Sequence, residues 1–210
     1  MKPLAIFGGT FDPVHLGHLN VAWEAAELLD AEVRLVPANV PPHRASPHAS
    51  AVERVAMLRA ALRGQDRLQL DTRELDRDGP SYTVDTLAGL RAEQGERPLV
   101  LLVGQDAFDG LDRWHRWREL LELAHVGVLD RPGFQSALSP TLADALDGRF
   151  TQRIADLHGA PAGKVMQLNV TPLEISATRV RQLLAEGRDP RYLLPAGVFA
   201  EPSVLQPYRR

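Results

Sequence analysis

The sequence has no cysteine and only two lysines among its 210 residues, and it contains no long apolar run. Without cysteine the chain has no disulfide framework, no thiol nucleophile and no cysteine-bound zinc. The longest uninterrupted apolar run, residues 99–103, is far too short to cross a bilayer. The N-terminus passes from Lys2 straight into a glycine-containing segment, which is not the pattern of a signal peptide. We therefore expect a soluble, cytoplasmic protein.

The chain also has little net charge. A formal charge of −3 gives the whole molecule no electrostatic attraction for nucleic acid or for a membrane surface. We therefore expect small-molecule partners, with no nucleic-acid or membrane partner. The sequence does not indicate an oligomeric state.

Short apolar segments alternate with amphipathic segments along most of the chain. The apolar segments, expected to be strands, are residues 4–7, 33–36, 68–70, 99–103, 126–129 and 165–170. This alternation predicts an α/β fold: a Rossmann-like, doubly wound, mostly parallel sheet with helices on both faces. At 210 residues, with 44% hydrophobic content, the chain fits a single domain spanning residues 1–210.

The most informative segment is residues 4–18, where an apolar strand ends at Gly8-Gly9 and leads into a helix that follows His15 and His18. Backbone N–H groups can close on a phosphate at such a turn, and the helix N-terminus adds favourable polarity. Histidines spaced i, i+3 fall on one helical face and can donate hydrogen bonds to a phosphoryl group. The alternatives are ordinary surface histidines or a metal site, but no nearby acid or cysteine completes a ligand set.

A second glycine follows the most strand-like segment, residues 99–103. In open α/β sheets the ligand crevice lies at the carboxyl ends of the strands, so Gly104 and Asp106 are expected at the same rim as Gly8 and Gly9. A carboxylate there can accept both hydroxyls of a ribose.

Three other segments offer polar or aromatic groups. The stiff loop 37–44 presents His43 and Arg44, although spacing alone slightly favours an incidental proline turn. The hydroxyls of residues 81–86 fit helix caps better than ligands. Trp114 is a candidate for an exposed ring that stacks on a flat ligand, whereas Trp117 leads into an amphipathic helix and is expected in the core.

Near the C-terminus, Ser176 can cap a helix whose first turn also carries Thr178 and Arg181. Free N–H groups, hydroxyls and guanidinium groups together suit a polyphosphate. Taken alone, the segment fits a capped surface helix with solvated arginines better than a phosphate site.

Together these segments resemble a known family. Residues 8–18, Gly-Gly-Thr-Phe-Asp-Pro-Val-His-Leu-Gly-His, are similar to the signature of the HxGH nucleotidyltransferase superfamily, and residues 175–181 resemble its ISSTxxR motif, with Ala177 for the second serine. Residues 39–44, 81–86 and 104–114 resemble the NxPPHK, SYTxDT and GxDxxxxLxxW segments of bacterial nicotinate-nucleotide adenylyltransferases, with Arg44 for the usual lysine. The resemblance weakens over residues 134–163 and after Pro195.

The resemblance implies that ATP and nicotinate mononucleotide react to give deamido-NAD and pyrophosphate by direct in-line attack, with substrate-bound Mg²⁺ and no protein metal site. It makes residues 176–210 a C-terminal helical part that carries the second ATP motif. It implies three groups of site residues: catalytic His15, His18 and Arg181; ATP-binding Gly8, Gly9, Thr10, Phe11, Gly104, Asp106, Ile175, Ser176 and Thr178; and mononucleotide-binding Asn39, His43, Arg44, Tyr82, Thr86, Trp114 and His115.

Other functions remain open within and beyond this superfamily. The acceptor could instead be nicotinamide mononucleotide or phosphopantetheine, although the SYTxDT-like segment and Trp114 disfavour the latter. A fragment of a class I aminoacyl-tRNA synthetase is disfavoured by the length and charge of the chain. A non-catalytic nucleotide sensor on the same fold is the alternative from a different class. Such a sensor is expected to have lost a motif histidine or arginine, yet His15, His18 and Arg181 are all present.

Overall fold

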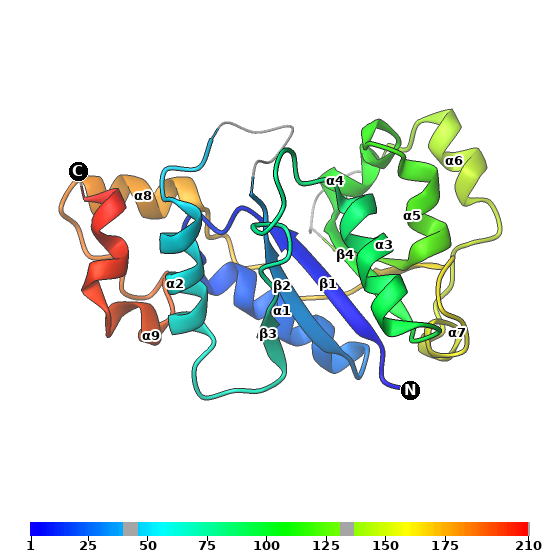
Figure 1. Ribbon diagram of the computed structural model, residues 1–210, viewed down its shortest axis with the longest axis horizontal. Helices are drawn as coiled ribbons and strands as arrows, with labels where there is room; N and C mark the ends of the chain where they lie inside the picture. Colours follow the sequence, from blue (N-terminus) through cyan, green and yellow to red (C-terminus); the bar gives the residue numbers. More distant parts are fainter. Residues whose placement is uncertain (40–45, 131–136, 210) are drawn as a thin grey trace.

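The computed structural model describes residues 1–39, 46–130 and 137–209. The strands are β1 (Leu4–Gly9), β2 (Glu32–Pro37), β3 (Leu68–Leu70), β4 (Leu99–Gly104), β5 (His125–Leu129) and β6 (Val165–Leu168). They form one six-stranded sheet in the order β3-β2-β1-β4-β5-β6, and every neighbouring pair is parallel (Figure 1). The predicted α/β fold is confirmed, including all six strands. β1 extends two residues further than predicted, and β6 ends two residues earlier.

The helices are α1 (Leu16–Leu28), α2 (Ala51–Ala61), α3 (Thr83–Gln94), α4 (Gln105–Asp109), α5 (Trp117–Leu123), α6 (Pro140–Leu146), α7 (Ile154–His158), α8 (Ala177–Ala185) and α9 (Ala196–Phe199), with 3-10 turns η1 (Leu111–Arg113) and η2 (Pro202–Tyr208). Alternate residues of β1 enter two separate cores. Ala5 packs with α1, α2, α8 and η2, whereas Leu4 and Ile6 pack with α3 to α6. Figure 1 shows α2, α8 and α9 grouped at one end of the molecule and α3 to α6 at the other. No helix in the described ranges is long and apolar enough to span a membrane.

Some large apolar side chains on α1 and α2 are exposed. The ring of Trp23 on α1 is 38% exposed and lies under the guanidinium of Arg67, and Val52 on α2 is 79% exposed. The inward face of α2 is set by Arg54, Val55 and Leu58. Arg54 is buried because its Nη1 donates a hydrogen bond to the Thr10 carbonyl at 2.8 Å. Val52, two residues earlier on the helix, therefore points away from the core.

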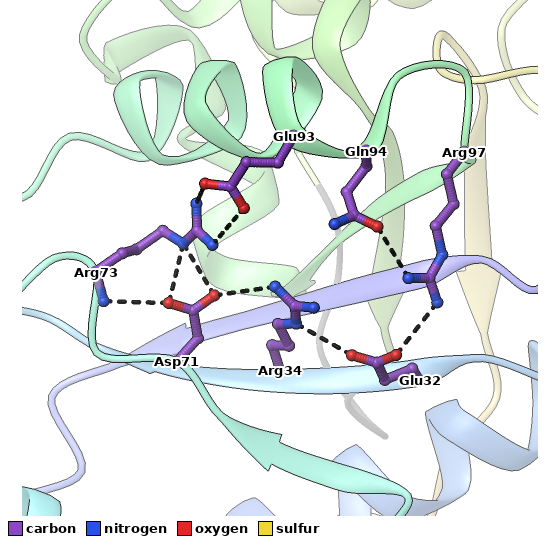
Figure 2. Close-up of polar contacts among 7 residues, drawn as sticks. All are labelled: Glu32, Arg34, Asp71, Arg73, Glu93, Gln94 and Arg97. Atoms are coloured by element: carbon purple, nitrogen blue, oxygen red, sulfur yellow. Dashed lines mark hydrogen bonds and ion pairs between the residues drawn. The ribbon is translucent and has the colours of Figure 1, made fainter.

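On the side of β2 that faces α3, the first part of the strand is polar, and only Val36 near its end is apolar and buried. Val33 and Leu35 alternate into the opposite core, so Glu32 and Arg34 face α3. There they join an ion-pair cluster that runs from β2 to the end of α3 (Figure 2). The cluster consists of Glu32, Arg34, Asp71, Arg73, Glu93, Gln94 and Arg97.

Arg73 is the central link of the cluster. Its Nε donates to Asp71 at 2.9 Å, and its two terminal nitrogens donate to the two carboxylate oxygens of Glu93 at 2.8 and 3.0 Å (Figure 2). These contacts tie the segment after β3 to α3. Residues 74–82, which follow Arg73, reach the candidate site described next.

Candidate active site

A cavity of about 840 Å³ lies at the carboxyl ends of β1 and β4, the position expected for a ligand in an open parallel sheet. Most of the predicted site residues line it. They are Gly8, Gly9, Thr10, Phe11, His15, His18, Tyr82, Thr86, Gly104, Asp106, Trp114, His115, Ile175, Ser176, Thr178 and Arg181. Asn39 is not among the lining residues, and His43 and Arg44 lie outside the described residues.

The glycine turn of β1 is shaped by close packing. A Cβ at Gly9 would lie 2.9 Å from the buried ring of Phe11, which itself adopts a positive φ of 49°. A Cβ at Gly8 would meet no atom of the described residues within 4 Å. The glycines therefore let the Phe11 ring support the turn while the Gly8 backbone stays open to a ligand.

His15 and His18 stack on each other at the start of α1, with ring centroids 3.6 Å apart and an interplanar angle of 24°. The backbone N–H of His15 donates to Nδ1 of His18 at 3.3 Å, so a neutral His18 ring carries its proton on Nε2. Gly17 has no side chain between them: a Cβ there would lie 3.1 Å from Nδ1 of His15. This close approach explains the glycine of the motif.

Burial makes the imidazole of His15 chemically different from that of His18. His15 is the N-cap residue of α1 and is only 5% exposed, rather than an open ring on the helix face. Its buried Nδ1 has no hydrogen-bond partner among the described residues. Burial lowers the pKa of His15 to about 4, so its ring is neutral near pH 7.

The start of α8 meets the glycine motif directly. Ser176 caps the helix by accepting a hydrogen bond from the Arg179 N–H at 3.2 Å. Nη1 of Arg181 donates to the Asp12 carbonyl at 2.7 Å, and its Nη2 donates to the Thr178 hydroxyl at 3.2 Å. The two motifs, 169 residues apart in sequence, therefore converge on one cavity, as predicted.

Asp12 is the most densely bonded acid of the site. Its carboxylate accepts hydrogen bonds from the N–H of His48 (2.7 Å), the N–H of Ala49 (3.0 Å) and the hydroxyl of Tyr208 (2.7 Å). Burial alone would raise the pKa of Asp12, but these hydrogen bonds and the charge of Arg181 hold it below its usual value. Asp12 is therefore ionised and fixed in place.

The start of α3 forms the opposite wall. The prediction that hydroxyls of residues 81–86 cap the helix is wrong: no side-chain hydrogen bond from the described residues caps the start of α3. The Thr86 hydroxyl instead donates to buried Glu74 at 2.7 Å and accepts from Arg77, while the Ser81 hydroxyl accepts from the Asn39 N–H at 2.8 Å. Burial raises the pKa of Glu74. Asn39 thus supports the wall from behind.

Aromatic rings complete this wall. The rings of Tyr82 and His115 lie 4.2 Å apart at 30°. Trp114 lines the cavity but is half-buried and packs partly against the core, whereas a more exposed ring was expected. Trp117 is buried in the core, as predicted. The cavity therefore has a flat, partly apolar side in addition to the side formed by the glycine turn, the histidine pair and the start of α8.

Asp106 lies at the start of α4, exposed at the rim that β1 and β4 share. A Cβ at Gly104 would lie 3.1 Å from its carboxylate oxygen, so the glycine leaves this acid room to turn toward a ligand. Across the described part of the chain, no group of three or more His, Asp or Glu residues could hold a metal ion.

The lining residues that were not predicted include three titratable groups, Asp12, His48 and Glu74. Asp12 had a signal, because it stands inside the motif between the glycine pair and the histidine pair. Glu74 had none: it is one acid in a charged loop, and only the fold turns it inward.

Comparison with known proteins agrees with this geometry. Residues 6–183 match the family described as cytidylyltransferase-like. A protein of Aeromonas hydrophila named "probable nicotinate-nucleotide adenylyltransferase" is 49% identical over 197 residues, which cover 93% of this chain and 92% of that protein. A protein of Pseudomonas syringae with the same name is 48% identical over 210 residues, covering 99% and 94%.

Solved structures share the fold. The nicotinic acid mononucleotide adenylyltransferase of Plasmodium falciparum, solved in complex with NaAD, aligns with a TM-score of 0.72 at 14% identity, covering 100% of this chain and 99% of that one. The same Plasmodium enzyme in complex with APC aligns with a TM-score of 0.69 at 15% identity, covering 99% and 96%. At such identities the likeness concerns the fold alone. The family match and the near-full-length relatives show that the chain belongs to the cytidylyltransferase-like family, as one of its nicotinate-nucleotide adenylyltransferases.

Proposed function

We propose that the cavity transfers an adenylyl group from ATP to nicotinate mononucleotide, giving deamido-NAD and pyrophosphate. The observation that carries this proposal is the convergence of the His15–His18 pair and Arg181 on one cavity beside the open Gly8 turn. Imidazole N–H groups, a guanidinium and a glycine turn together fit a triphosphate. The choice of substrates follows the names of the relatives, which are called probable nicotinate-nucleotide adenylyltransferases.

The reaction requires one bond to form as another breaks. A phosphate oxygen of the mononucleotide bonds to the α-phosphorus of ATP while the bond from that phosphorus to the bridging oxygen breaks, and the electron pair leaves with pyrophosphate. No proton has to move. The protein therefore contributes mainly alignment and stabilisation of the charge that grows on the leaving group.

On the ATP side, each lining residue has a proposed role. The Nε2–H of His18 and the guanidinium of Arg181 donate to the phosphate oxygens, whereas neutral His15 supports the His18 ring from behind. The remaining ATP contacts come from the glycine turn (Gly8, Gly9, Thr10 and Phe11), from the start of α8 (Ile175, Ser176 and Thr178) and from the ribose site (Gly104 and Asp106). Mg²⁺ bound by phosphate oxygens and water neutralises part of the leaving-group charge.

On the mononucleotide side, Trp114 stacks on the pyridine ring beside the Tyr82–His115 pair. The N–H groups of Thr83 and Val84 precede the first intrahelical bond of α3 and can receive the nicotinate carboxylate. Thr86 serves this wall indirectly, since its N–H donates to Tyr82 and its hydroxyl to Glu74. Asn39 holds the wall, while His43 and Arg44 retain the substrate contacts that the family resemblance implies.

The deciding experiment measures pyrophosphate release from ATP and Mg²⁺ on addition of nicotinate mononucleotide, with nicotinamide mononucleotide in a parallel reaction. We expect release with the acid and much less with the amide. Faster release with the amide would reassign the acceptor. Binding of ATP without release from either compound would indicate a nucleotide sensor instead.

A further inference from the structure

The C-terminal turn contacts the glycine motif through one buried hydrogen bond. The hydroxyl of Tyr208 on η2 donates to Oδ1 of Asp12 at 2.7 Å, across 196 residues of sequence. Both side chains are buried, Tyr208 at 4% exposure and Asp12 at 5%. Burial and the contact with Asp12 raise the pKa of Tyr208, so the hydroxyl stays protonated and remains a donor.

Two groups of Asp12, its carboxylate and its backbone carbonyl, link this contact to the cavity. Its carboxylate accepts the N–H groups of His48 and Ala49, and residues 46–48 form part of the cavity wall. Its backbone carbonyl accepts the hydrogen bond from Arg181, a proposed phosphate ligand. The carboxylate therefore holds three separate parts of the chain in register: the glycine motif, the segment 46–49 and η2.

Tyr208 itself is not among the residues that line the cavity. We therefore expect any effect of its hydroxyl on turnover to pass through Asp12, the group to which the hydroxyl donates. The ring has a second role that is purely structural, because it packs in the same core as Val204 and Leu205 of η2. The two roles are separable, since the hydroxyl can be removed while the ring remains.

We infer that Tyr208 is a positioning residue for adenylyl transfer, whose hydroxyl holds the Asp12 carboxylate so that the glycine turn and Arg181 stay aligned with the triphosphate. This inference rests on the proposed function. A small misplacement of such groups is costly, because shifts of about 1 Å can lower turnover about 100-fold. Loss of the single hydrogen bond from Tyr208 should displace Asp12 by less than about 1 Å.

The test compares Tyr208→Phe with Tyr192→Phe. Tyr192 lies 16 residues away, is 86% exposed and offers the same change as a matched control. We expect Tyr208→Phe to lower kcat about tenfold, as for a lost hydrogen bond to a charged group, with the KM for the mononucleotide nearly unchanged. Tyr192→Phe should match the wild type. Unchanged kcat in Tyr208→Phe, with an active wild type, would overturn the inference; an inactive wild type would instead overturn the proposed function.

Two further variants separate positioning from stability. Val204→Ala disturbs the packing of the same turn but leaves the hydroxyl on Asp12, so it should lower the melting temperature with kcat retained below that temperature. An equal loss of kcat in Val204→Ala and Tyr208→Phe, at equal folded fraction, would make the effect merely structural.

In an Asp12→Asn background, Tyr208→Phe should cause no further loss of kcat. A second full tenfold loss there would show that the hydroxyl does not act through Asp12.

Discussion

At the scale of single residues, the two stacked histidines differ in their exposure to solvent. His15 is buried, its Nδ1 has no hydrogen-bond partner within the part of the chain that the structure describes, and burial lowers its pKa from 6.5 to about 4. Between those values the unfolded chain binds a proton that the native protein excludes, so native stability falls as the pH falls.

This difference predicts a specific pH dependence of stability. Between pH 7 and pH 5, the wild type should lose about 2 kcal/mol of unfolding free energy through His15 alone. Denaturant unfolding at the two pH values, on the wild type and on His15→Gln, measures the difference. The variant should lose less by about this amount, and equal losses in both proteins would mean that His15 is not protected from protonation.

His18 is expected to matter for the chemical step. His18→Ala removes a donor aimed at charge that develops in the transition state, so kcat should fall about 100-fold or more. The KM for the mononucleotide should change little, because the proposed binding site of that substrate is at the opposite wall. His158→Ala on α7, away from the cavity, is the control. A variant with a raised KM and full kcat would assign His18 to substrate binding instead.

Trp114 should show the reverse pattern. Trp114→Ala removes the proposed stacking surface and should raise the KM for the mononucleotide about tenfold, with a smaller change in kcat. Steady-state kinetics at saturating ATP measures both. Trp23→Ala, which removes a half-exposed tryptophan outside the cavity, should leave both constants unchanged. An unaltered KM in Trp114→Ala would make that ring part of the packing only.

At the scale of elements, the β3–α3 connection depends on charge rather than on apolar packing. Arg73→Ala would leave Asp71, whose side chain is only 10% exposed, without its strongest partner and would release Glu93. We expect a loss of about 2 kcal/mol in the free energy of unfolding. Arg59→Ala at an exposed position of α2 should change it by less than about 0.5 kcal/mol.

A conservative substitution sharpens the same measurement. Arg73→Lys keeps the charge but cannot donate two parallel hydrogen bonds to Glu93, so its stability should fall between those of the wild type and Arg73→Ala. A lysine variant as stable as the wild type would show that only net charge is needed there.

Elements whose sequence pattern matches their environment were predictable. Residues 99–103 are apolar throughout because β4 is central and covered on both faces, and Ser50 and Glu53 form the capping box that the pattern Ser-x-x-Glu is typical of. Apolar character alone would place Val52 in the core, but it is exposed because the buried Arg54 lies on the inward face of α2. The prediction that hydroxyls of residues 81–86 cap α3 was wrong because the Thr86 hydroxyl bonds to Glu74 and the Ser81 hydroxyl bonds to Asn39 instead. Both partners are distant in sequence. Local patterns cannot encode such partners.

The same limit applies to the candidate site. The glycine turn, the histidine pair and Arg181 stand in contiguous motifs, which makes them visible in the sequence. The partners of Asp12 come from residues 48, 49 and 208 and become visible only once the chain is folded.

At the scale of the whole molecule, the proposed metal requirement belongs to the substrate. Since no cluster of ligands for a metal exists within the described ranges, removal of Mg²⁺ with EDTA should stop pyrophosphate release without changing the melting temperature of the free protein. Activity should return when Mg²⁺ is added back. A lower melting temperature in EDTA would reveal a metal bound by the protein itself.

The bond between Tyr208 and Asp12 also has a meaning for biosynthesis. Asp12 is translated early, and its partner hydroxyl is added 196 residues later. At about 5–20 residues per second, the ribosome needs about 10–40 s to cover that distance. Throughout this interval the nascent polypeptide has its nucleotide motif but lacks the group that holds Asp12. A newly made molecule therefore completes the hydrogen bonds around its glycine turn only after the whole sheet has been synthesised.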